Sequence, residues 1–173
     1  PDEHDAELYP RVVRETADYV LREMTGDDGA FYSAQDAEVD SREGQNYLWT
    51  PPEIEKAMSL LPREEETELA RLATAMFGLD QGANFRDPHH ADAPAANVLY
   101  LPTRLDDLAA ARGLTMAQVL EQRRLIRQRL LEVRMQRPQP RTDDKAIASW
   151  NGMMIAALAM AGRYDPGYVV LVY

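Results

Sequence analysis

The segment GAFYSAQDAEVDSREGQNYLWT, from Gly29 to Thr50, places two unlike patterns side by side. Its flanks, AFYSA and NYLWT, are rich in aromatic residues and are typical of strands. Its middle is polar and carries four carboxylates, namely Asp36, Glu38, Asp40 and Glu43. We expect the two flanks to pair as antiparallel strands around an acidic loop, with NVLYL (97–101) as a candidate third strand. The predicted β element therefore covers about 30–49 and 97–101.

Helical patterns surround this segment on both sides. The spacing of apolar residues predicts helices over 5–24, 51–61, 63–77, 103–113, 116–136 and 144–163. Two of them begin with a capping box, formed by Thr50 with Glu53 and by Thr115 with Gln118. We expect Asp143 to cap the last helix, in which Gly152 and many alanines predict close contact with another helix.

The predicted fold class is therefore mainly α, with a small antiparallel β-hairpin. A length of 173 residues is enough for one domain with a real hydrophobic core. The chain begins at Pro1 and not at an initiator Met, so residues 1–173 form either a single helical domain or a fragment of a larger one.

The composition excludes several classes of protein. A net charge of −10 argues against a nucleic-acid partner and against an anionic membrane surface. The absence of cysteine excludes disulfides, thiolate metal sites and thiol catalysis within this chain. No apolar run approaches the ~20 residues of a membrane span, and no signal peptide opens the sequence. We expect a cytoplasmic protein.

Asp36 marks the first candidate site, at the end of the strand-like FYSA. Catalytic groups commonly lie on loops that a rigid scaffold positions, and two carboxylates that face one sugar ring can supply a general acid and a base or nucleophile. The simpler interpretation is that the acidic residues only solvate a hairpin loop. We favour that interpretation for Glu38 and Asp40, but it explains Asp36 less well.

The second candidate site is TDDKAIASWN, which contains Asp143, Asp144, Lys145, Trp150 and Asn151. A helix N-terminus explains the first part, because Asp143 can cap the helix and Asp144 complements the helix dipole. It does not explain Trp150 and Asn151. A tryptophan at the mouth of a pocket can stack on a sugar, although a tryptophan in a helix core is the commoner case.

Metal and cofactor chemistry lacks support in the sequence. His89 and His90 are adjacent, and no third ligand follows at a metal-binding spacing, so we interpret them as loop histidines. No phosphate-binding glycine-rich loop, serine nucleophile motif or nucleotide fingerprint is found. We therefore expect neither a metal nor a cofactor.

Three blocks carry a resemblance to a known family: GAFYSAQDAEVDSREGQNYLWTPPEI, DPHHADAPAANVL and DDKAIASWNGMMIAALA. In this order and at these separations they resemble the thioredoxin-domain-containing family of bacterial YyaL and the mammalian spermatogenesis-associated protein. That family joins a thioredoxin-like domain, absent from this chain, to a helical domain similar to the six-hairpin (α/α)₆ toroids of sugar epimerases and many glycosidases.

The resemblance implies a fold, a site and a partner. The fold is a partial toroid of helical hairpins, with β-hairpins at the mouth where a sugar binds. The implied site pairs Asp36 with Asp143 or Asp144 as catalytic carboxylates, and its implied lining is Tyr32, Trp49, Trp150 and Asn151. The chain offers about half the helices of a complete ring, so apolar helix faces stay open. Self-association, or further chain that completes the toroid, is therefore expected.

Two functions remain open at this stage. The first is a carbohydrate-active or carbohydrate-binding domain, epimerase-like or hydrolase-like, that uses the paired carboxylates. The second is a non-catalytic helical module that binds a sugar, a peptide or a partner protein. Epimerases of this fold use histidine bases, and neither acidic block contains a histidine, so a catalytic interpretation favours carboxylate chemistry. Whether the two acidic segments meet distinguishes the two functions.

Overall fold

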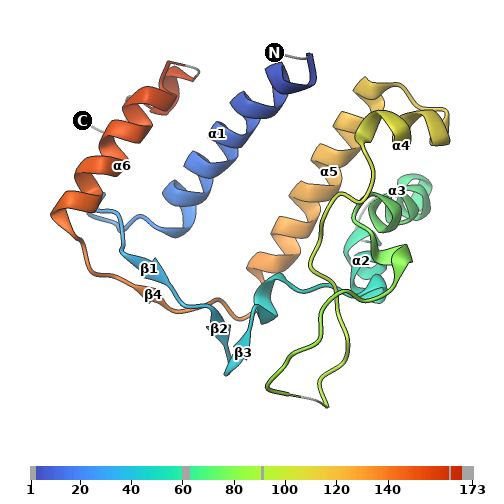
Figure 1. Cartoon of the computed structure of the whole chain (residues 1–173), viewed down its shortest axis with the longest axis horizontal. Helices are drawn as coiled ribbons and strands as arrows, with labels where there is room; N and C mark the ends of the chain where they lie inside the picture. Colours follow the sequence, from blue (N-terminus) through green and yellow to red (C-terminus); the bar gives the residue numbers. More distant parts are fainter. Residues whose placement is uncertain (1–2, 60–62, 91, 164, 169–173) are drawn as a thin grey trace. The chain divides into compact units, whose positions relative to one another are not determined.

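The computed structural model describes residues 3–59, 63–90, 92–163 and 165–168 (Figure 1). These residues form six α-helices and four short strands, so the predicted fold class, mainly α with a small antiparallel β element, is confirmed. The chain divides into two compact units. Unit 1 contains residues 1–36 and 141–173, and unit 2 contains residues 37–140.

Unit 1 is built from two helices and a two-stranded ribbon. Its elements are α1 (Glu3–Glu23), β1 (Ala34–Gln35), β4 (Thr142–Asp143), α6 (Ala148–Ala161) and the 3₁₀ helix Pro166–Tyr168. Helices α1 and α6 lie side by side (Figure 1). Their shared core consists of Ala17, Val20, Phe31, Leu158, Ala161 and Tyr168.

Unit 2 holds the larger core. Its helices are α2 (Pro51–Met58), α3 (Arg63–Met76), α4 (Leu105–Arg112) and α5 (Met116–Met135). Strands β2 (Glu38–Val39) and β3 (Arg42–Glu43) and the 3₁₀ helices Gln45–Tyr47 and Leu79–Gln81 complete it. The most deeply buried apolar residues of this core are Ile54, Met58, Met76, Val119 and Ile126.

Both predicted capping boxes are confirmed. The backbone N–H of Thr50 donates to Oε2 of Glu53 at 2.8 Å, and that of Thr115 donates to Oε1 of Gln118 at 2.9 Å. Each bond satisfies a donor at the helix start that would otherwise have no partner within the helix. These local signals fix where α2 and α5 begin.

The predicted pairing of AFYSA with NYLWT is wrong. Ala34 and Gln35 pair instead with Asp143 and Thr142, from the far end of the sequence. Gly44 takes a left-handed backbone (φ 67°) and residues 45–47 form a 3₁₀ helix. The first residues of NYLWT are therefore part of a helical turn and not of a strand.

The acidic middle of the segment, expected to be a loop, forms a hairpin of its own. Glu38 pairs with Glu43 and Val39 with Arg42. The two residues of its turn, Asp40 and Ser41, both have positive φ, as the tightest hairpin turns require. NVLYL does not form a third strand in the part of the chain that is described, where Asn97 makes an isolated bridge to Trp49.

The start of α6 also differs from the prediction. Asp143 lies in β4 and α6 begins at Ala148, after Ile147 in the N-cap position, so Asp143 does not cap the helix. The close contact expected at Gly152 is likewise wrong. A Cβ atom at this position would meet nothing within 4 Å in the described part of the structure.

Asn151 ties α6 to the segment before β1. Its Oδ1 accepts a hydrogen bond from the backbone N–H of Phe31 at 2.8 Å, and its Nδ2 donates to the carbonyl of Phe31 at 2.9 Å. The two residues are 120 positions apart in the sequence. Because Phe31 is buried, these bonds satisfy main-chain groups that have little access to water.

Replacing Asn151 with Leu should therefore destabilise unit 1. The substitution leaves the N–H and C=O of Phe31 without the side-chain partners they have now, which costs about 2 kcal/mol or more. Urea unfolding followed by circular dichroism measures the loss. Gly152→Ala, at the next position, is the matched control and should raise the free energy of unfolding by about 0.5–1 kcal/mol. Equal stability of Asn151→Leu and wild type would show that the hydrogen bonds between Asn151 and Phe31 do not stabilise unit 1.

Tyr168 makes the stability of unit 1 depend on alkaline pH. Burial, aided by the hydrogen bond from its hydroxyl to Asp18 at 2.8 Å, raises the pKa of Tyr168 from 10.0 to about 12. The unfolded chain releases this proton near pH 10 and the folded chain near pH 12. The stabilisation is thus complete below pH 10 and is lost as the pH rises towards 12.

We expect the free energy of unfolding to fall between pH 10 and pH 12, and to fall less in Tyr168→Phe. Urea titrations at both ends of this interval measure the difference. Tyr9→Phe, which removes a hydroxyl group at an exposed position, is the control substitution. An identical fall in Tyr168→Phe and wild type would show that other groups cause it.

Candidate functional site

The ribbon of β1 and β4 brings the two predicted acidic segments together. Ala34 lies opposite Asp143, and Gln35 lies opposite Thr142. The pairing continues one residue further, because the N–H of Asp36 donates to the carbonyl of Arg141 at 2.7 Å. Asp36 and Asp143 are therefore diagonal neighbours across the ribbon.

The register also decides which carboxylates share a face. Residues directly opposite in an antiparallel pair point to the same side, and neighbours along a strand alternate. Asp36 and Asp143 consequently lie on one face, with a diagonal Cα separation of about 7–8 Å. The other face includes Gln35, whose Oε1 accepts a hydrogen bond from Tyr19 of α1 at 3.0 Å. Asp144 follows the end of β4, so the register does not assign it to either face.

Asp143 is held in its ionised form. Its Oδ2 is 2.9 Å from Nζ of Lys145, and its Oδ1 accepts a hydrogen bond from the backbone N–H of Lys145 at 3.3 Å. The ammonium group of Lys145, with this N–H, lowers the pKa of Asp143, and Asp143 in turn raises the pKa of Lys145. With 41% of its side chain exposed, Asp143 can accept hydrogen bonds from a ligand or act as a base.

This direction bears on the acid–base roles expected from the sequence. In a glycosidase pair the general acid has a raised pKa, whereas the pKa of Asp143 is lowered. Asp143 thus suits the role of base, nucleophile or hydrogen-bond acceptor better than that of proton donor.

The predicted lining residues lie in different surroundings. Tyr32 is half-buried in unit 1, and its hydroxyl packs so closely over Gly26 that a Cβ there would be 2.6 Å away. Trp150, in the first turn of α6, is 50% exposed and offers a ring to a ligand. Asn151 uses its amide on Phe31, so its role in this structure is to hold the backbone.

Trp49 belongs to unit 2 and is only 3% exposed. The guanidinium carbon of Arg137 lies 3.9 Å from the centroid of its ring. Arg137 also donates to the carbonyl of Leu48 at 2.7 Å, which fixes the cation over the ring. Trp49 therefore serves the core of unit 2 and has no open ring face.

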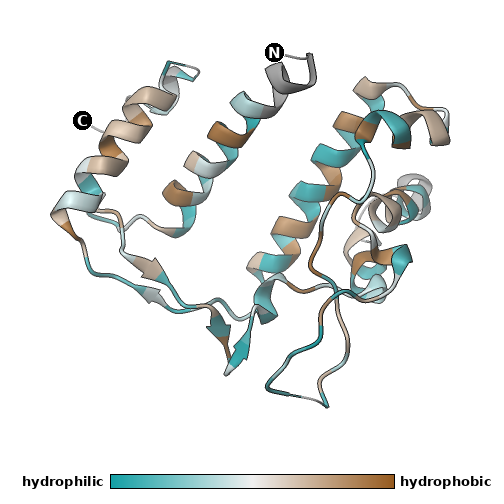
Figure 2. Cartoon of the chain, in the orientation of Figure 1, coloured by the Kyte–Doolittle hydropathy of each residue, from teal (hydrophilic) through white to brown (hydrophobic). Residues whose placement is uncertain are grey.

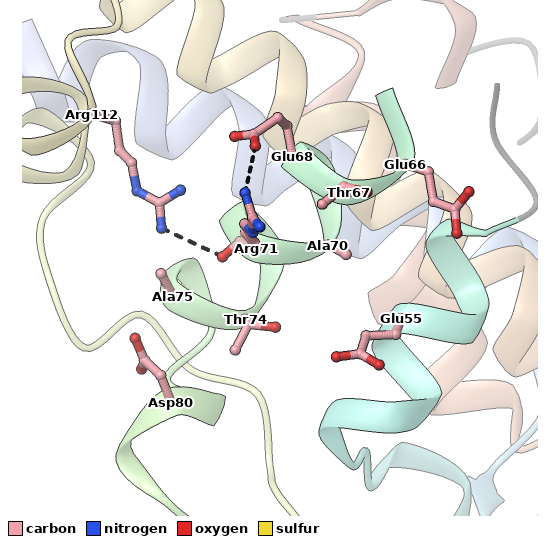
Figure 3. Close-up of a pocket in the computed structure, with 10 residues that line it drawn as sticks. All are labelled: Glu55, Glu66, Thr67, Glu68, Ala70, Arg71, Thr74, Ala75, Asp80 and Arg112. Atoms are coloured by element: carbon pink, nitrogen blue, oxygen red, sulfur yellow. Dashed lines mark hydrogen bonds and ion pairs between the residues drawn. The ribbon is translucent and has the colours of Figure 1, made fainter. Parts of the chain in front are cut away.

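Unit 2 has a groove that the sequence did not suggest, with a volume of about 840 Å³. Figure 3 shows its lining side chains on α2, on α3 and around Asp80 and Arg112. Glu68 pairs with Arg71 at 2.9 Å, and Arg112 approaches the carbonyl of Arg71 at 3.5 Å. Glu68 and Arg71 are both largely exposed, so water screens their interaction. The groove is an open, hydrated surface with mixed charge.

A second, smaller pocket in unit 2 has a volume of about 240 Å³. It is lined by Arg42, Gln45, Leu48, Thr50, Glu53, Phe85, Asp87, Ala93, Pro94 and Ala96. We call it the Arg42 pocket. The sequence interpretation included none of these residues in a site, because they come from two stretches of the chain that are separated by more than thirty residues.

An Asp–His pair adjoins the Arg42 pocket. Nδ1 of His90 is 2.8 Å from Oδ2 of Asp87, and the N–H of His89 donates to Oδ1 of Asp87 at 2.8 Å. The His89 amide, and then the ring of His90, lower the pKa of Asp87. The sequence interpretation took both histidines as simple loop residues. The spacing of Asp87 and His90 within DPHH was the available signal for this pair.

Two further properties concern the described residues alone. Across 3–59, 63–90, 92–163 and 165–168, no group of three or more histidine, aspartate and glutamate side chains is arranged to hold a metal ion. Among the helices of that same part of the chain, none combines the length and apolar character needed to cross a membrane.

The fold defines a class: a mainly helical domain with a small antiparallel two-stranded ribbon. No model of a known protein family matches the chain. Curated relatives do match. Spermatogenesis-associated protein 20 of Homo sapiens is 30% identical over 167 residues, and that of Rattus norvegicus is 30% identical over 169 residues. The protein of the same name from Mus musculus is 29% identical over 167 residues.

Each of these matches covers 90% of this chain and 21% of the relative. The kinship expected from the three sequence blocks, with the spermatogenesis-associated family, is thereby confirmed. The chain spans about a fifth of the length of the curated relatives that it matches. The activity, substrates and partners of such a whole protein are matters of proposal.

Proposed function

We propose that this chain is a carbohydrate-binding domain, with its site on the exposed face of the β1–β4 ribbon. The same carboxylates could also hydrolyse a glycosidic bond. The observation that carries the proposal is the register that makes Asp36 and Asp143 diagonal neighbours on one face. Carboxylates accept hydrogen bonds from the hydroxyl groups of a sugar, and two of them at this spacing can bracket one ring.

The geometry is compatible with acid–base chemistry on a glycosidic bond. Carboxyl groups of glycosidase pairs lie about 5–10 Å apart, and two side chains on one face whose Cα atoms are about 7–8 Å apart can bring their carboxyl groups to such a distance. Asp143, which Lys145 keeps ionised, would act as base or nucleophile, and Asp36 would donate the proton. Trp150 adds an exposed aromatic ring in the same unit on which an apolar sugar face can stack.

The test compares three substitutions in the 173-residue chain. Asp36→Asn and Asp143→Asn should each weaken binding of mono- and disaccharides about tenfold or more, because a hydrogen bond to a charged group is worth about 1.5–3 kcal/mol. Asp144→Asn removes the same charge from the next position, which lies outside the paired residues, and is the matched control. Ligand-observed NMR with a panel of neutral sugars measures binding, and release of reducing ends measures turnover.

Circular dichroism of each variant separates a lost site from a lost fold. Two outcomes would overturn the proposal. One is that wild type binds no sugar of the panel, and the other is that all three variants bind as wild type does.

A second candidate function, a helical interaction module, is favoured by the surface of α6. Figure 2 shows mostly neutral to apolar colours along this helix. Four of its large side chains are exposed, namely Trp150, Met153, Ile155 and Met160. A helix that is apolar on all sides is normally buried. As an interaction module, α6 would pack against a second copy of this chain or against further helices that complete a toroid.

This candidate predicts that the 173-residue chain self-associates through α6. The double substitution Met153→Glu and Met160→Glu places charges on two side chains that are 64% and 65% exposed, so it should cost the folded monomer little. It should lower the average mass in sedimentation equilibrium, because burying each charge in a helix interface is unfavourable. Met135→Glu, at the end of α5, is the control. A wild type that stays monomeric at every concentration would contradict the prediction.

A further inference from the structure

The Arg42 pocket is enclosed by three segments of unit 2. Strand β3 and the following turn contribute Arg42 and Gln45, the start of α2 contributes Thr50 and Glu53, and the loop 85–96 contributes Phe85 and Asp87. Its volume of about 240 Å³ is below the usual 300–1,000 Å³ of pockets for drug-sized ligands. A fitting ligand therefore has roughly the size of one sugar ring or one amino acid.

Both carboxylates of the pocket already have partners within the protein. Oε2 of Glu53 accepts hydrogen bonds from the N–H and the hydroxyl of Thr50, each at 2.8 Å. Oε1 of Glu53 is 3.2 Å from Nη2 of Arg137. Asp87 accepts its hydrogen bonds from His89 and His90. Neither carboxylate needs a cation from a ligand.

Arg42 differs from them. Its guanidinium group makes no hydrogen bond or ion pair with any residue in the described part of the chain. It is nevertheless directed inward, because Arg42 lies opposite Val39 in the hairpin and opposite residues share a face. Val39 is buried, so this is the face of the hairpin turned towards the protein.

A half-buried guanidinium group without a counter-charge favours an anionic ligand. Its planar fork of N–H groups matches the two oxygens of a carboxylate or a phosphoryl group. Helix α2 supplies little of this attraction, because its first two residues are Pro51 and Pro52, which have no N–H to offer. The anion would therefore depend on Arg42.

The remaining lining suits a ligand that also carries hydroxyl groups. Gln45 has an amide that can donate and accept, and Thr50 has a hydroxyl oxygen that can accept. Phe85 and Pro94 offer apolar surface for the carbon skeleton. We propose that the Arg42 pocket binds a small hydroxylated anion, such as a sugar acid or a sugar phosphate, with its anionic group on the guanidinium of Arg42.

This proposal does not rest on the carbohydrate site of unit 1, which uses other residues in the other compact unit. The experiment is isothermal titration of the 173-residue chain with glucuronate, glucose 6-phosphate and neutral glucose. Wild type should bind at least one of the two anions. The Arg42 pocket should bind neutral glucose at least tenfold more weakly than that anion. A preference for glucuronate identifies a carboxylate site, and a preference for glucose 6-phosphate identifies a phosphate site.

Arg42→Gln should weaken binding of the preferred anion at least tenfold, which corresponds to about 1.4 kcal/mol. Arg86→Gln is the matched control, since Arg86 is an exposed arginine one residue after Phe85 and does not line the pocket. Arg42→Lys keeps the charge without the fork and should retain part of the affinity. Asp36→Asn should leave anion binding unchanged, which keeps this site distinct from that of unit 1.

Should Arg42→Gln unfold, the Arg42→Lys protein and chemical-shift changes at Gln45 and Phe85 in wild type still report on the site. The proposal is overturned if neither anion binds to wild type, or if the Arg42→Gln and Arg86→Gln proteins lose equal affinity. Shift changes confined to unit 1 would overturn it as well.

Discussion

The antiparallel pairing of β1 with β4 is the constraint on which the arrangement of the chain depends. The chain leaves unit 1 at Asp36 and returns to it at Arg141, and the hydrogen bond between these two residues closes the intervening segment at its base. Unit 2 is thus an insertion between two strands of unit 1. The same pairing aligns the two acidic segments, so the topology and the candidate site have one cause.

Such a short ribbon cannot hold unit 1 together by itself. Isolated two-stranded ribbons are marginal in water, and closing a long loop costs conformational entropy. The packing of α1 against α6 supplies the missing stabilisation through Phe31, Leu158 and their neighbours. Asn151 joins the two contributions, because it bonds the backbone of Phe31 from a position on α6. A residue that looked like a ligand contact in the sequence is therefore part of the framework that fixes the register.

The helices could be predicted from the sequence because their signals are local. Apolar periodicity and the two capping boxes lie within a few residues of what they determine, and the structure agrees with them to within a few residues at most ends. The strands could not be predicted in the same way. Each has only two residues, and the partner of Ala34 is Asp143, so no local pattern records the pairing. The aromatic flanks predicted extended backbone, but only Ala34 of AFYSA lies in a strand and NYLWT begins in a 3₁₀ helix.

The candidate sites show the same division. The sequence could nominate Asp36 with Asp143 or Asp144, but only the structure shows that Asp143 lies in the paired strand and Asp144 after its end. The burial of Trp49 under Arg137 depends on contacts between residues far apart in sequence, and so does the pocket around Arg42. No pattern in the sequence distinguishes Arg42 from the other charged residues of this polar segment. The orientation of Arg42 towards the pocket depends on the hairpin, which places it on the same face as the buried Val39.

The two proposed sites favour ligands of different charge, neutral in one and anionic in the other. The net charge of −10 therefore affects binding at each site differently. On the ribbon, the carboxylates repel anions and favour neutral hydroxyl groups. In the Arg42 pocket, the guanidinium must attract an anion towards a protein that repels it at long range. Physiological salt screens charges over about 8 Å, so the repulsion fades beyond that distance while the contact inside the pocket persists. Arg42 can therefore act at short range, where its fork and the enclosing walls discriminate by shape.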